Sequence, residues 1–284
     1  MNALPARAIE LIHGIAGRPV TIPQLGFGTY KITPHDTEAA VRTAIELGYR
    51  HIDTAQMYGN EAQVGKAIAG CGLPRDQLFI TSKLNNTAHE PARARESFDA
   101  TLRALGLEVL DLFLVHWPMA LSGDLIGTWA TMIEFLDSGR VRAIGVSNHQ
   151  REHLETIIKA TGVTPAVNQI EIHPYLTQEP LRTAHRQLGI VTQAWSPLGR
   201  GHLLRDPVIE SVARATGHTS AQVVLRWHLQ RGDVVFPKSV HPERIAENSQ
   251  LFDFELDDDQ LARISALNRD HRFGSHPDEV QGAK

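Results

Sequence analysis

The 284-residue chain has a single cysteine, no excess of basic charge and no long apolar stretch. Cys71 alone cannot form an internal disulfide, which favours a reducing compartment and predicts a cytoplasmic protein. With a net charge of -4, the chain has no basic field to attract nucleic acid. No stretch approaches the length of a transmembrane helix, and no apolar run of an export signal follows Met1–Arg7. We therefore expect a protein without nucleic-acid or membrane partners.

Glycine motifs that bind nucleotides are also missing. Gly26-Phe27-Gly28 begins like a dinucleotide fingerprint, but Lys31 stands where the third glycine belongs, and no Walker motif occurs. A doubly wound open sheet usually carries one of these motifs. Their absence disfavours that fold.

What the chain does contain is a regular alternation of apolar strands and amphipathic helices. The expected strands are Gln24–Gly28, Tyr49–Asp53, Leu78–Ser82, Val109–Val115, Ala143–Val146, Ala166–Ile170, Ile190–Ala194 and Val234–Phe236. Eight such strands, most of them apolar on both faces, predict a closed parallel (β/α)8 TIM barrel. Ile9–Ile22 predicts an N-terminal β-hairpin, and Asp257–Asn268 an additional C-terminal helix. Because no linker or change of composition interrupts the alternation, we expect one domain over residues 1–284.

Ionisable side chains end three successive expected strands. Asp53, Lys83 and His116 end the second, third and fourth strands, and Tyr58 lies in the loop after the second. Singly, these residues have ordinary explanations, such as a helix cap, a surface lysine and a structural histidine. In a barrel, however, the carboxyl ends of all strands open on one face, where active sites lie. The four side chains are therefore expected to meet in one pocket.

These four residue types suit proton donation to a carbonyl oxygen. A free tyrosine has a pKa of about 10, and lowering it to about 7 takes roughly 4 kcal/mol of preferential phenolate stabilisation. An ammonium group beside the phenol, in a partly water-excluded pocket, is expected to supply much of this. Asp53 would hold Lys83 charged and in place, and His116 would orient the carbonyl. Reduction of a carbonyl needs a proton for the oxygen and a hydride for the carbon. The set predicts the source of the proton, with Tyr58 as the general acid, and leaves the hydride to be supplied by another group.

Motifs over nearly the whole chain, from Ile22 to Glu279, resemble those of the aldo-keto reductases. They are Gly48–Ala55 (GYRHIDTA), Ile80–Lys83 (ITSK), Leu112–Pro118 (LFLVHWP), Ile144–Asn148 (IGVSN) and Pro237–Ser239 (PKS). Val167–Glu171 (VNQIE) with His173-Pro174, and Ser275–Glu279 (SHPDE), are similar to the bacterial 2,5-diketo-D-gluconate reductase branch. The resemblance implies an NADPH-dependent enzyme of the alcohol dehydrogenase (NADP+) type, with catalysis by Asp53, Tyr58, Lys83 and His116 and no metal.

The resemblance also implies where NADPH would bind. Trp195 would stack on the nicotinamide, uncharged donors and acceptors would hold its carboxamide, and the loop Ser196–Gly201 would cover the pyrophosphate. Lys238, Ser239 and Arg244 gather two cations and a hydroxyl at a helix N-terminus, which suits the 2′-phosphate. The implied cofactor residues are Thr29, Asp53, Ser147, Asn148, Gln169, Trp195, Ser196, Leu198, Gly201, Lys238, Ser239, Val240, Arg244, Glu247 and Asn248.

The substrate end departs from the family pattern. Asn85 stands where the family usually has a tryptophan after Lys-Leu, which predicts a wider or more polar pocket. The other expected substrate contacts are Tyr30, His116 and Trp117. We expect small polar or α-dicarbonyl substrates, with diketo sugar acids as one option, rather than steroids.

Two other classes of protein stay open. A cofactor-binding regulatory subunit with vestigial catalysis would bind NADPH tightly, turn over negligibly and hold a stable partner. A metal-dependent barrel hydrolase would need His or carboxylate ligands at convergent strand ends. The leading prediction is a monomeric reductase of small carbonyl compounds.

Overall fold

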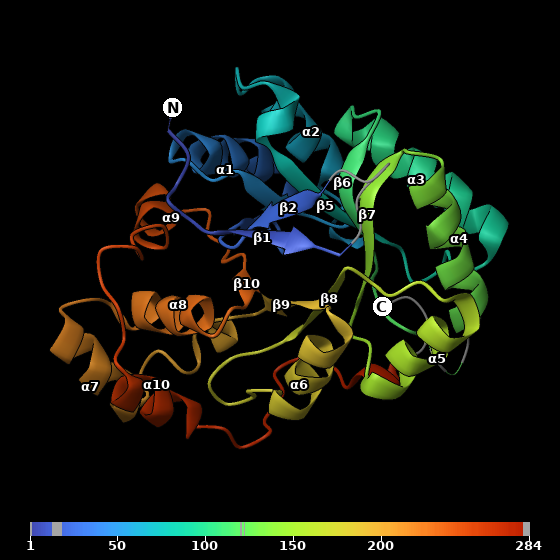
Figure 1. Ribbon diagram of the computed structural model, residues 1–284. Helices are drawn as coiled ribbons and strands as arrows, with labels where there is room; N and C mark the ends of the chain where they lie inside the picture. Colours follow the sequence, from blue (N-terminus) through green and yellow to red (C-terminus); the bar gives the residue numbers. More distant parts are fainter. Residues whose placement is uncertain (1, 13–18, 120, 122, 281–284) are drawn as a thin grey trace.

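Eight parallel strands form a barrel in the computed structural model, which describes residues 2–12, 19–119, 121 and 123–280 (Figure 1). Neighbours in the sheet follow the chain order from β3 to β10. The strands are β3 (Phe27–Gly28), β4 (His51–Asp53), β5 (Phe79–Leu84), β6 (Leu110–Val115), β7 (Val141–Ser147), β8 (Val167–Glu171), β9 (Val191–Trp195) and β10 (Val234–Val235). The predicted (β/α)8 fold is confirmed.

Hydrogen bonds between the first and last strands close the barrel. Gly26 N donates to Val235 O over 2.7 Å, and Val235 N donates to Gln24 O over 2.9 Å. One step further along the seam, a Cβ on Gly28 would lie 2.6 Å from Phe236 O. A glycine is therefore required at position 28 for the two strands to approach this closely.

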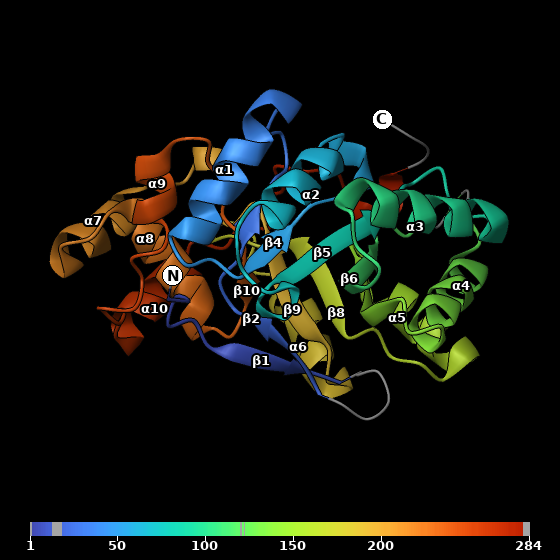
Figure 2. The same ribbon diagram turned by 90° about the horizontal axis from the view of Figure 1, so that it is seen from above.

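The predicted N-terminal hairpin is present and closes the amino end of the barrel. It pairs β1 (Ala8–Leu11) with β2 (Val20–Pro23) in antiparallel register. Its buried side chains pack against residues at or near the amino ends of barrel strands; the cluster includes Leu11, Val20, Ile22, Phe79, Val167 and Val234. Figure 2 shows this hairpin along one side of the barrel. Most of the expected turn, residues 16–19, lies outside the described residues.

Helices cover the outside of the barrel. They are α1 (Pro34–Glu46), α2 (Glu61–Ala69), α3 (Pro91–Leu105), α4 (Leu125–Asp137), α5 (Arg151–Thr161), α6 (Glu179–Leu188), α7 (Pro207–Thr216), α8 (Ser220–Gln230), α9 (Pro242–Glu247) and α10 (Asp258–Ser265). Local chemistry sets their ends. Before α3, Glu90 accepts hydrogen bonds from the first free backbone amides, and Gly106 ends the helix in the left-handed region at φ 67°.

Several element boundaries differ from the sequence-based ones. β5 runs through Lys83 to Leu84, so that this lysine lies inside the strand instead of just after it. The sequence pattern predicts the first of these helices over Thr37–Leu47. α1 begins three residues earlier, because Thr33 accepts a hydrogen bond from Asp36 N and Pro34 suits the first turn. α10 is the additional C-terminal helix, shorter at both ends than Asp257–Asn268.

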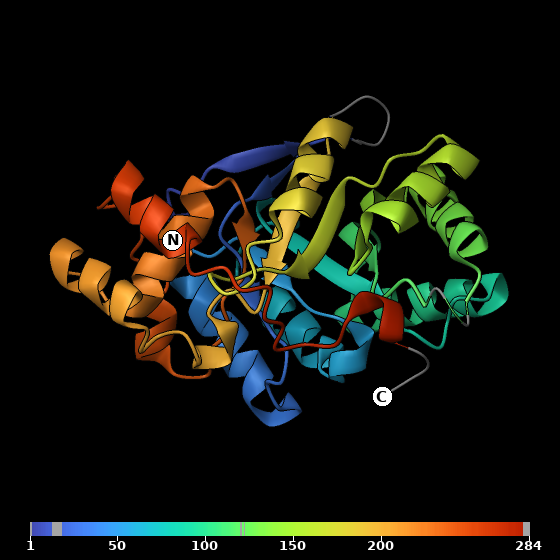
Figure 3. The same cartoon turned by 90° about the horizontal axis from the view of Figure 1, so that it is seen from below.

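The segment after α10 returns to the barrel. Figure 3 shows it as the red strip that crosses the barrel towards the helices of the chain's middle third. It ends in the short 3₁₀ helix η5 (Pro277–Glu279), where Asp278 Oδ1 lies 3.8 Å from His153 Nε2 of α5. The segment therefore lies across the carboxyl ends of the strands. Among the described residues, no helix is both long and apolar enough to cross a membrane.

Candidate active site

The four ionisable residues expected to meet do lie together at the carboxyl end of the barrel. Lys83 Nζ donates to Asp53 Oδ1 over 2.7 Å and to the Tyr58 hydroxyl over 3.3 Å. The rings of Tyr58 and His116 lie edge to face, with centroids 5.9 Å apart. A phenol, an ammonium, a carboxylate and an imidazole thus share one site.

The loop that carries Tyr58 is fixed by a buried asparagine. Tyr58 ends the 3₁₀ helix η2 (Gln56–Tyr58), which Gly59 terminates at φ 67°. Asn60 then donates from Nδ2 to Thr29 O (3.0 Å) and to Ile32 O (3.1 Å). These bonds tie the loop after β4 to the loop after β3. The Thr29 hydroxyl donates to Asp53 O in the same region, so Thr29 helps to hold the loops together.

The electrostatics differ from the expectation that Lys83 brings the phenol towards neutrality. Burial raises the pKa of Tyr58 well above 10, and the negative charge of Asp53 and the neighbouring Tyr30 act in the same direction. Burial also lowers the pKa of Lys83 and raises that of Asp53, while the attraction between the two opposes both shifts. Because burial and the charge of Asp53 both disfavour the phenolate, Tyr58 keeps its proton through the neutral range.

His116 presents a neutral imidazole to this site. Burial, followed by the positive charge of Lys83, lowers the pKa of His116 well below 6.5. The backbone carbonyl oxygen of His116 accepts a hydrogen bond from Asn148 Nδ2 over 3.0 Å. This bond ties the loop after β6 to the end of β7. The ring atom Nδ1 has no hydrogen-bond partner in the part of the chain that the structure describes.

An amide cluster lies beside the four residues. Gln169 Nε2 donates to Asp53 Oδ2 over 2.7 Å and to Gln193 Oε1 over 2.8 Å. The Ser147 hydroxyl donates to Gln169 O, and Asn148 adopts a left-handed backbone at φ 62°, which asparagine tolerates better than most residues. Gln193 has no counterpart in the sequence-based prediction, because a glutamine inside a strand gives no sign of facing a site.

Trp195 ends β9 and borders the same cluster. Its indole nitrogen Nε1 donates to Asn148 Oδ1 over 2.8 Å. On the other side, Gly274 of the C-terminal segment packs so closely that a Cβ there would lie 2.3 Å from Trp195 Cη2. The indole is thus held at both ends.

A cavity of about 800 Å³ opens onto these groups. The expected residues that line it are Tyr30, Asp53, Tyr58, His116, Trp117, Ser147, Asn148, Gln169, Trp195, Ser196, Leu198, Gly201, Lys238 and Arg244. Further lining residues include Met57, Asn86 and Phe236, which were not predicted as contacts, and Arg200 and Ser275, which lie in the loop Ser196–Gly201 and the motif Ser275–Glu279. Lys83 is fully buried and does not border the cavity among the described lining residues.

Asn86, and not Asn85, is the asparagine on the cavity wall. The Asn85 side chain is used locally, because its Oδ1 accepts hydrogen bonds from the amide and hydroxyl of Thr87. Asn86 is buried, and its Oδ1 has no hydrogen-bond partner within the described residues. The polar group expected at this end of the site is therefore present one residue later.

Two cations border the far end of the cavity. Lys238 and Arg244 are exposed there, and neither makes an ion pair with another described residue. Ser239 Oγ accepts a hydrogen bond from His241 N over 3.1 Å, and Val240 is 37% exposed. Behind them, Glu247 accepts a hydrogen bond from the Thr219 hydroxyl, and Asn248 is buried at the end of α9. Glu247 and Asn248 are thus fixed close to the cations but outside the cavity lining.

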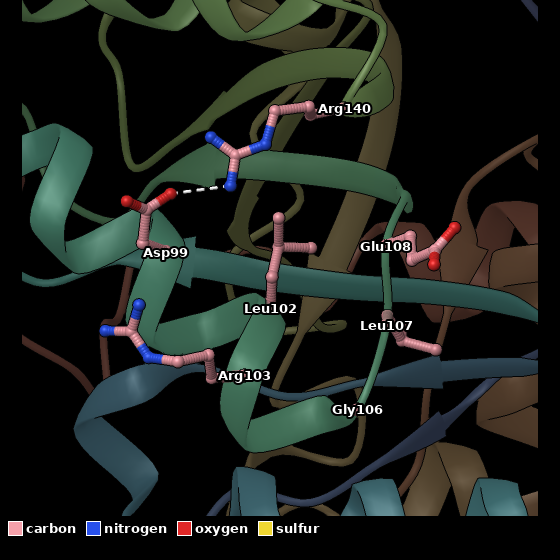
Figure 4. Close-up of a pocket in the computed structure, with 7 residues that line it drawn as sticks. All are labelled: Asp99, Leu102, Arg103, Gly106, Leu107, Glu108 and Arg140. Atoms are coloured by element: carbon pink, nitrogen blue, oxygen red, sulfur yellow. Dashed lines mark hydrogen bonds and ion pairs between the residues drawn. The ribbon is translucent and has the colours of Figure 1, made fainter.

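A second hollow, of about 620 Å³, lies at the amino ends of β6 and β7 (Figure 4). Its labelled polar contact is the ion pair between Arg140 and Asp99. It lies on the face opposite the carboxyl ends of the strands, so it is separate from the cavity. Within the described residues, no group of three or more His, Cys, Asp or Glu side chains is arranged to hold a metal ion.

Known proteins are similar to this chain in sequence and architecture. The model of the Aldo/keto reductase family matches residues 24–269. An aldo-keto reductase of Mycolicibacterium smegmatis is 49% identical over 257 residues, which are 90% of this chain and 94% of that protein. The morphine 6-dehydrogenase of Pseudomonas putida is 45% identical over 274 residues, covering 92% and 93% of the two chains. The crystal structure of a Gox0644 mutant in complex with NADPH matches with a TM-score of 0.92 and 41% identity, covering 98% of this chain and 99% of that one. The chain therefore belongs to the aldo/keto reductase family.

Proposed function

We propose that the protein is an NADPH-dependent oxidoreductase that reduces aldehydes and ketones to alcohols. The observation that carries this proposal is the contact of Lys83 with both Asp53 and Tyr58, beside a cavity that also reaches two cations without an ion pair among the described residues. Membership of the family supports it, as does the NADPH complex of the related Gox0644 structure.

The roles follow from the chemistry of each group. NADPH, when bound, supplies the hydride. We assign Tyr58 as the general acid: its raised pKa keeps it protonated, and an alkoxide is a stronger base than a phenolate, so the proton still moves to the new alcohol. Lys83 lies within hydrogen-bond distance and stabilises the phenolate that remains. His116, neutral and edge-on to Tyr58, orients the carbonyl oxygen.

The cavity residues fit the parts of NADPH. Hydroxyl and amide groups of Ser147, Asn148 and Gln169 lie beside Trp195, so a carboxamide and an aromatic ring find partners together. Lys238 and Arg244 offer positive charge at the other end, as the 2′-phosphate requires. The other cofactor residues that the resemblance implies complete the site in this proposal; they are Thr29, Asp53, Ser196, Leu198, Gly201, Ser239, Val240, Glu247 and Asn248.

For the substrate we propose small polar or α-dicarbonyl compounds, in keeping with the 2,5-diketo-D-gluconate reductase branch. The polar wall residue Asn86 and the neighbouring Tyr30 and Trp117 support this choice. The Pseudomonas putida relative is named for morphine, so a polycyclic alcohol is the second candidate. We also propose a cytoplasmic protein of one domain. A monomer is proposed because one chain supplies all four central residues: Asp53 in β4, Tyr58 in η2, Lys83 in β5 and His116 directly after β6.

A carbonyl panel tests the function. Purified protein is mixed with NADPH or NADH and with methylglyoxal, glyceraldehyde or 2,5-diketo-D-gluconate, and loss of the reduced cofactor is followed by absorbance; morphine with NADP+ tests the second candidate. We expect turnover with NADPH and the small carbonyls, and loss of most of it after Tyr58→Phe. Tight NADPH binding without turnover of any carbonyl would instead indicate a regulatory subunit. Activity abolished by a chelator would indicate a metal-dependent enzyme.

A further inference from the structure

A carboxylate outside the catalytic four is buried at the end of β8. Glu171 accepts hydrogen bonds from Phe273 N (2.7 Å) and from Gly274 N, which lies 3.1 Å from both carboxylate oxygens. It also contacts His173 Nε2 over 3.2 Å. Because an ionised carboxylate only accepts, His173 must carry its proton on Nε2 for this bond to form. One side chain of the barrel thus holds two consecutive amides from a segment about a hundred residues further along the chain.

The bonded segment forms part of the cavity wall. Gly274 lies between Glu171 and Trp195, since a Cβ on it would come 2.3 Å from Trp195 Cη2 and 3.0 Å from Glu171 Oε2. Gly274, Ser275 and Val280 all line the cavity, as does Trp195. The carboxylate therefore sets how closely the segment approaches the indole.

The neighbouring Phe273 links the segment to a second part of the wall. Its ring stacks on His202 with centroids 4.9 Å apart and lies 5.0 Å from the His173 ring. His202 follows the 3₁₀ helix η4 (Gly199–Gly201), and Arg200 and Gly201 line the cavity. The segment thus reaches both the Trp195 end and the Gly201 loop from one anchored point.

We infer that Glu171 is a positioning residue, whose negative charge holds the C-terminal segment 273–280 and Trp195 in place as one wall of the substrate and cofactor cavity. Burial alone would raise the pKa of Glu171, but hydrogen bonds from His173, Phe273 and Gly274 outweigh it and lower the pKa. The anchor is therefore charged at neutral pH. Its effect on kinetics rests on the proposed function, whereas its effect on the segment does not.

Hydrogen exchange in the ligand-free protein tests the anchor directly. Glu171→Gln keeps the size of the side chain but removes the charge and turns one acceptor into a donor that faces backbone N–H groups. We expect amide exchange of residues 273–280 to accelerate about tenfold or more, since charge-assisted bonds are lost, while peptides of β4 and β6 keep their protection. The matched control is Glu279→Gln, an exposed carboxylate of the same segment whose side chain makes no ion pair among the described residues.

Steady-state kinetics distinguish a positioning role from a general effect on folding, because only the former should change KM without changing kcat. In Glu171→Gln we expect KM for the carbonyl to rise about tenfold, by the same loss of bonds, with kcat nearly unchanged, because no group that touches the reacting atoms is altered. Gly274→Ala should also raise KM for the carbonyl. Its added Cβ would clash with the Trp195 ring and push the segment away from the indole. This second variant also decides the matter if Glu171→Gln does not fold.

The outcomes separate the inference from the proposed function. Fast exchange over 273–280 together with raised KM supports the anchor. Unchanged exchange in folded Glu171→Gln, or a fall in kcat with unchanged KM in both variants, overturns it. If the wild-type protein reduces no carbonyl, the proposed function fails, and the exchange experiment alone decides the role of Glu171.

Discussion

The ammonium of Lys83 lies 2.7 Å from Asp53 Oδ1, and the two side chains are 0% and 2% exposed. Removing two charges from water costs several kcal/mol each, and their attraction offsets this only while both are present. The ammonium also donates to Thr54 O over 2.9 Å and to the Tyr58 hydroxyl over 3.3 Å. The ion pair that is proposed to serve catalysis therefore also affects the stability of the fold, because each of its two charges is tolerated in the interior only while the other is present.

Removal of one partner should destabilise the fold more than removal of both. Lys83→Met leaves Asp53 buried and unpaired, which is expected to cost about 3–5 kcal/mol in the free energy of unfolding. The double variant Lys83→Met, Asp53→Asn has no buried charge here and should recover part of this loss. Urea unfolding of the wild type, both single variants and the double variant measures the coupling. Strictly additive losses would contradict mutual dependence.

Tyr58→Phe should abolish most carbonyl reduction without affecting cofactor binding. The substitution removes only the hydroxyl that donates the proton, and loss of a general acid costs about 10²–10⁴-fold in kcat/KM. Tyr30→Phe is the matched control, because its ring lies 5.1 Å from that of Tyr58 in the same cavity. Fluorescence titration with NADPH should give the same Kd for all three proteins. Full activity of Tyr58→Phe would exclude it as the acid.

Lys238→Ala should discriminate between the two nicotinamide cofactors. Lys238 borders the cavity without an ion pair among the described residues, so its charge is available to a ligand. If it contacts the 2′-phosphate, its loss should raise the Kd of NADPH about tenfold, as for a charge-assisted bond, and leave NADH unchanged. Lys159→Ala on α5 removes a lysine distant in the fold and serves as the control. Equal weakening of both cofactors would refute a contact with this phosphate.

The sequence sufficed for the barrel and for the four ionisable residues because both follow from short-range patterns, whereas most of the other cavity residues were predicted from the resemblance to the aldo-keto reductases. Apolar runs mark the strands, and Asp53, Lys83 and His116 come at or next to their carboxyl ends, which share one face in any such barrel. Gln193 could not be found in this way, since its contact with Gln169 depends on the register between β8 and β9. Glu171 depends on a segment a hundred residues away, which no local pattern reveals.

The two adjacent asparagines after β5 show the same limit and permit a sharp test. Which of them faces the cavity is decided by the turn that Asn85 forms with Thr87. Asn86→Leu should therefore change the ratio of kcat/KM between glyceraldehyde and propanal by about tenfold, because the site loses a polar partner for a substrate hydroxyl. Asn85→Leu should lower thermal stability through loss of its turn bonds and leave this ratio unchanged. The reverse result would place the specificity contact at Asn85.

Buried histidines should make the protein unstable in mild acid. Burial lowers the pKa of His51, His149 and His185 to about 3, although hydrogen bonds or nearby charges partly oppose it. The unfolded chain binds protons on these residues below about pH 6.5, whereas the folded chain does not until about pH 3. Stability is therefore unaffected above pH 6.5 and falls as the pH decreases from there, by up to about 1.4 kcal/mol per pH unit for each histidine.

At pH 5 the three histidines together should remove about 6 kcal/mol, which is comparable to the whole stability of many domains. Glu61, whose pKa burial raises, acts in the opposite direction above about pH 4.5, because as the pH falls its carboxyl is protonated in the folded state before it is in the unfolded chain. Urea unfolding at pH 7.5, 6.0 and 5.0 measures the slope. His149→Gln should reduce the slope of the free energy of unfolding against pH by about a third. The control His35→Gln, at an exposed position of α1, should leave this slope unchanged. A free energy of unfolding that stays constant from pH 7 to 5 would mean that these imidazoles accept protons in the folded state, and hence that the barrel admits water around them.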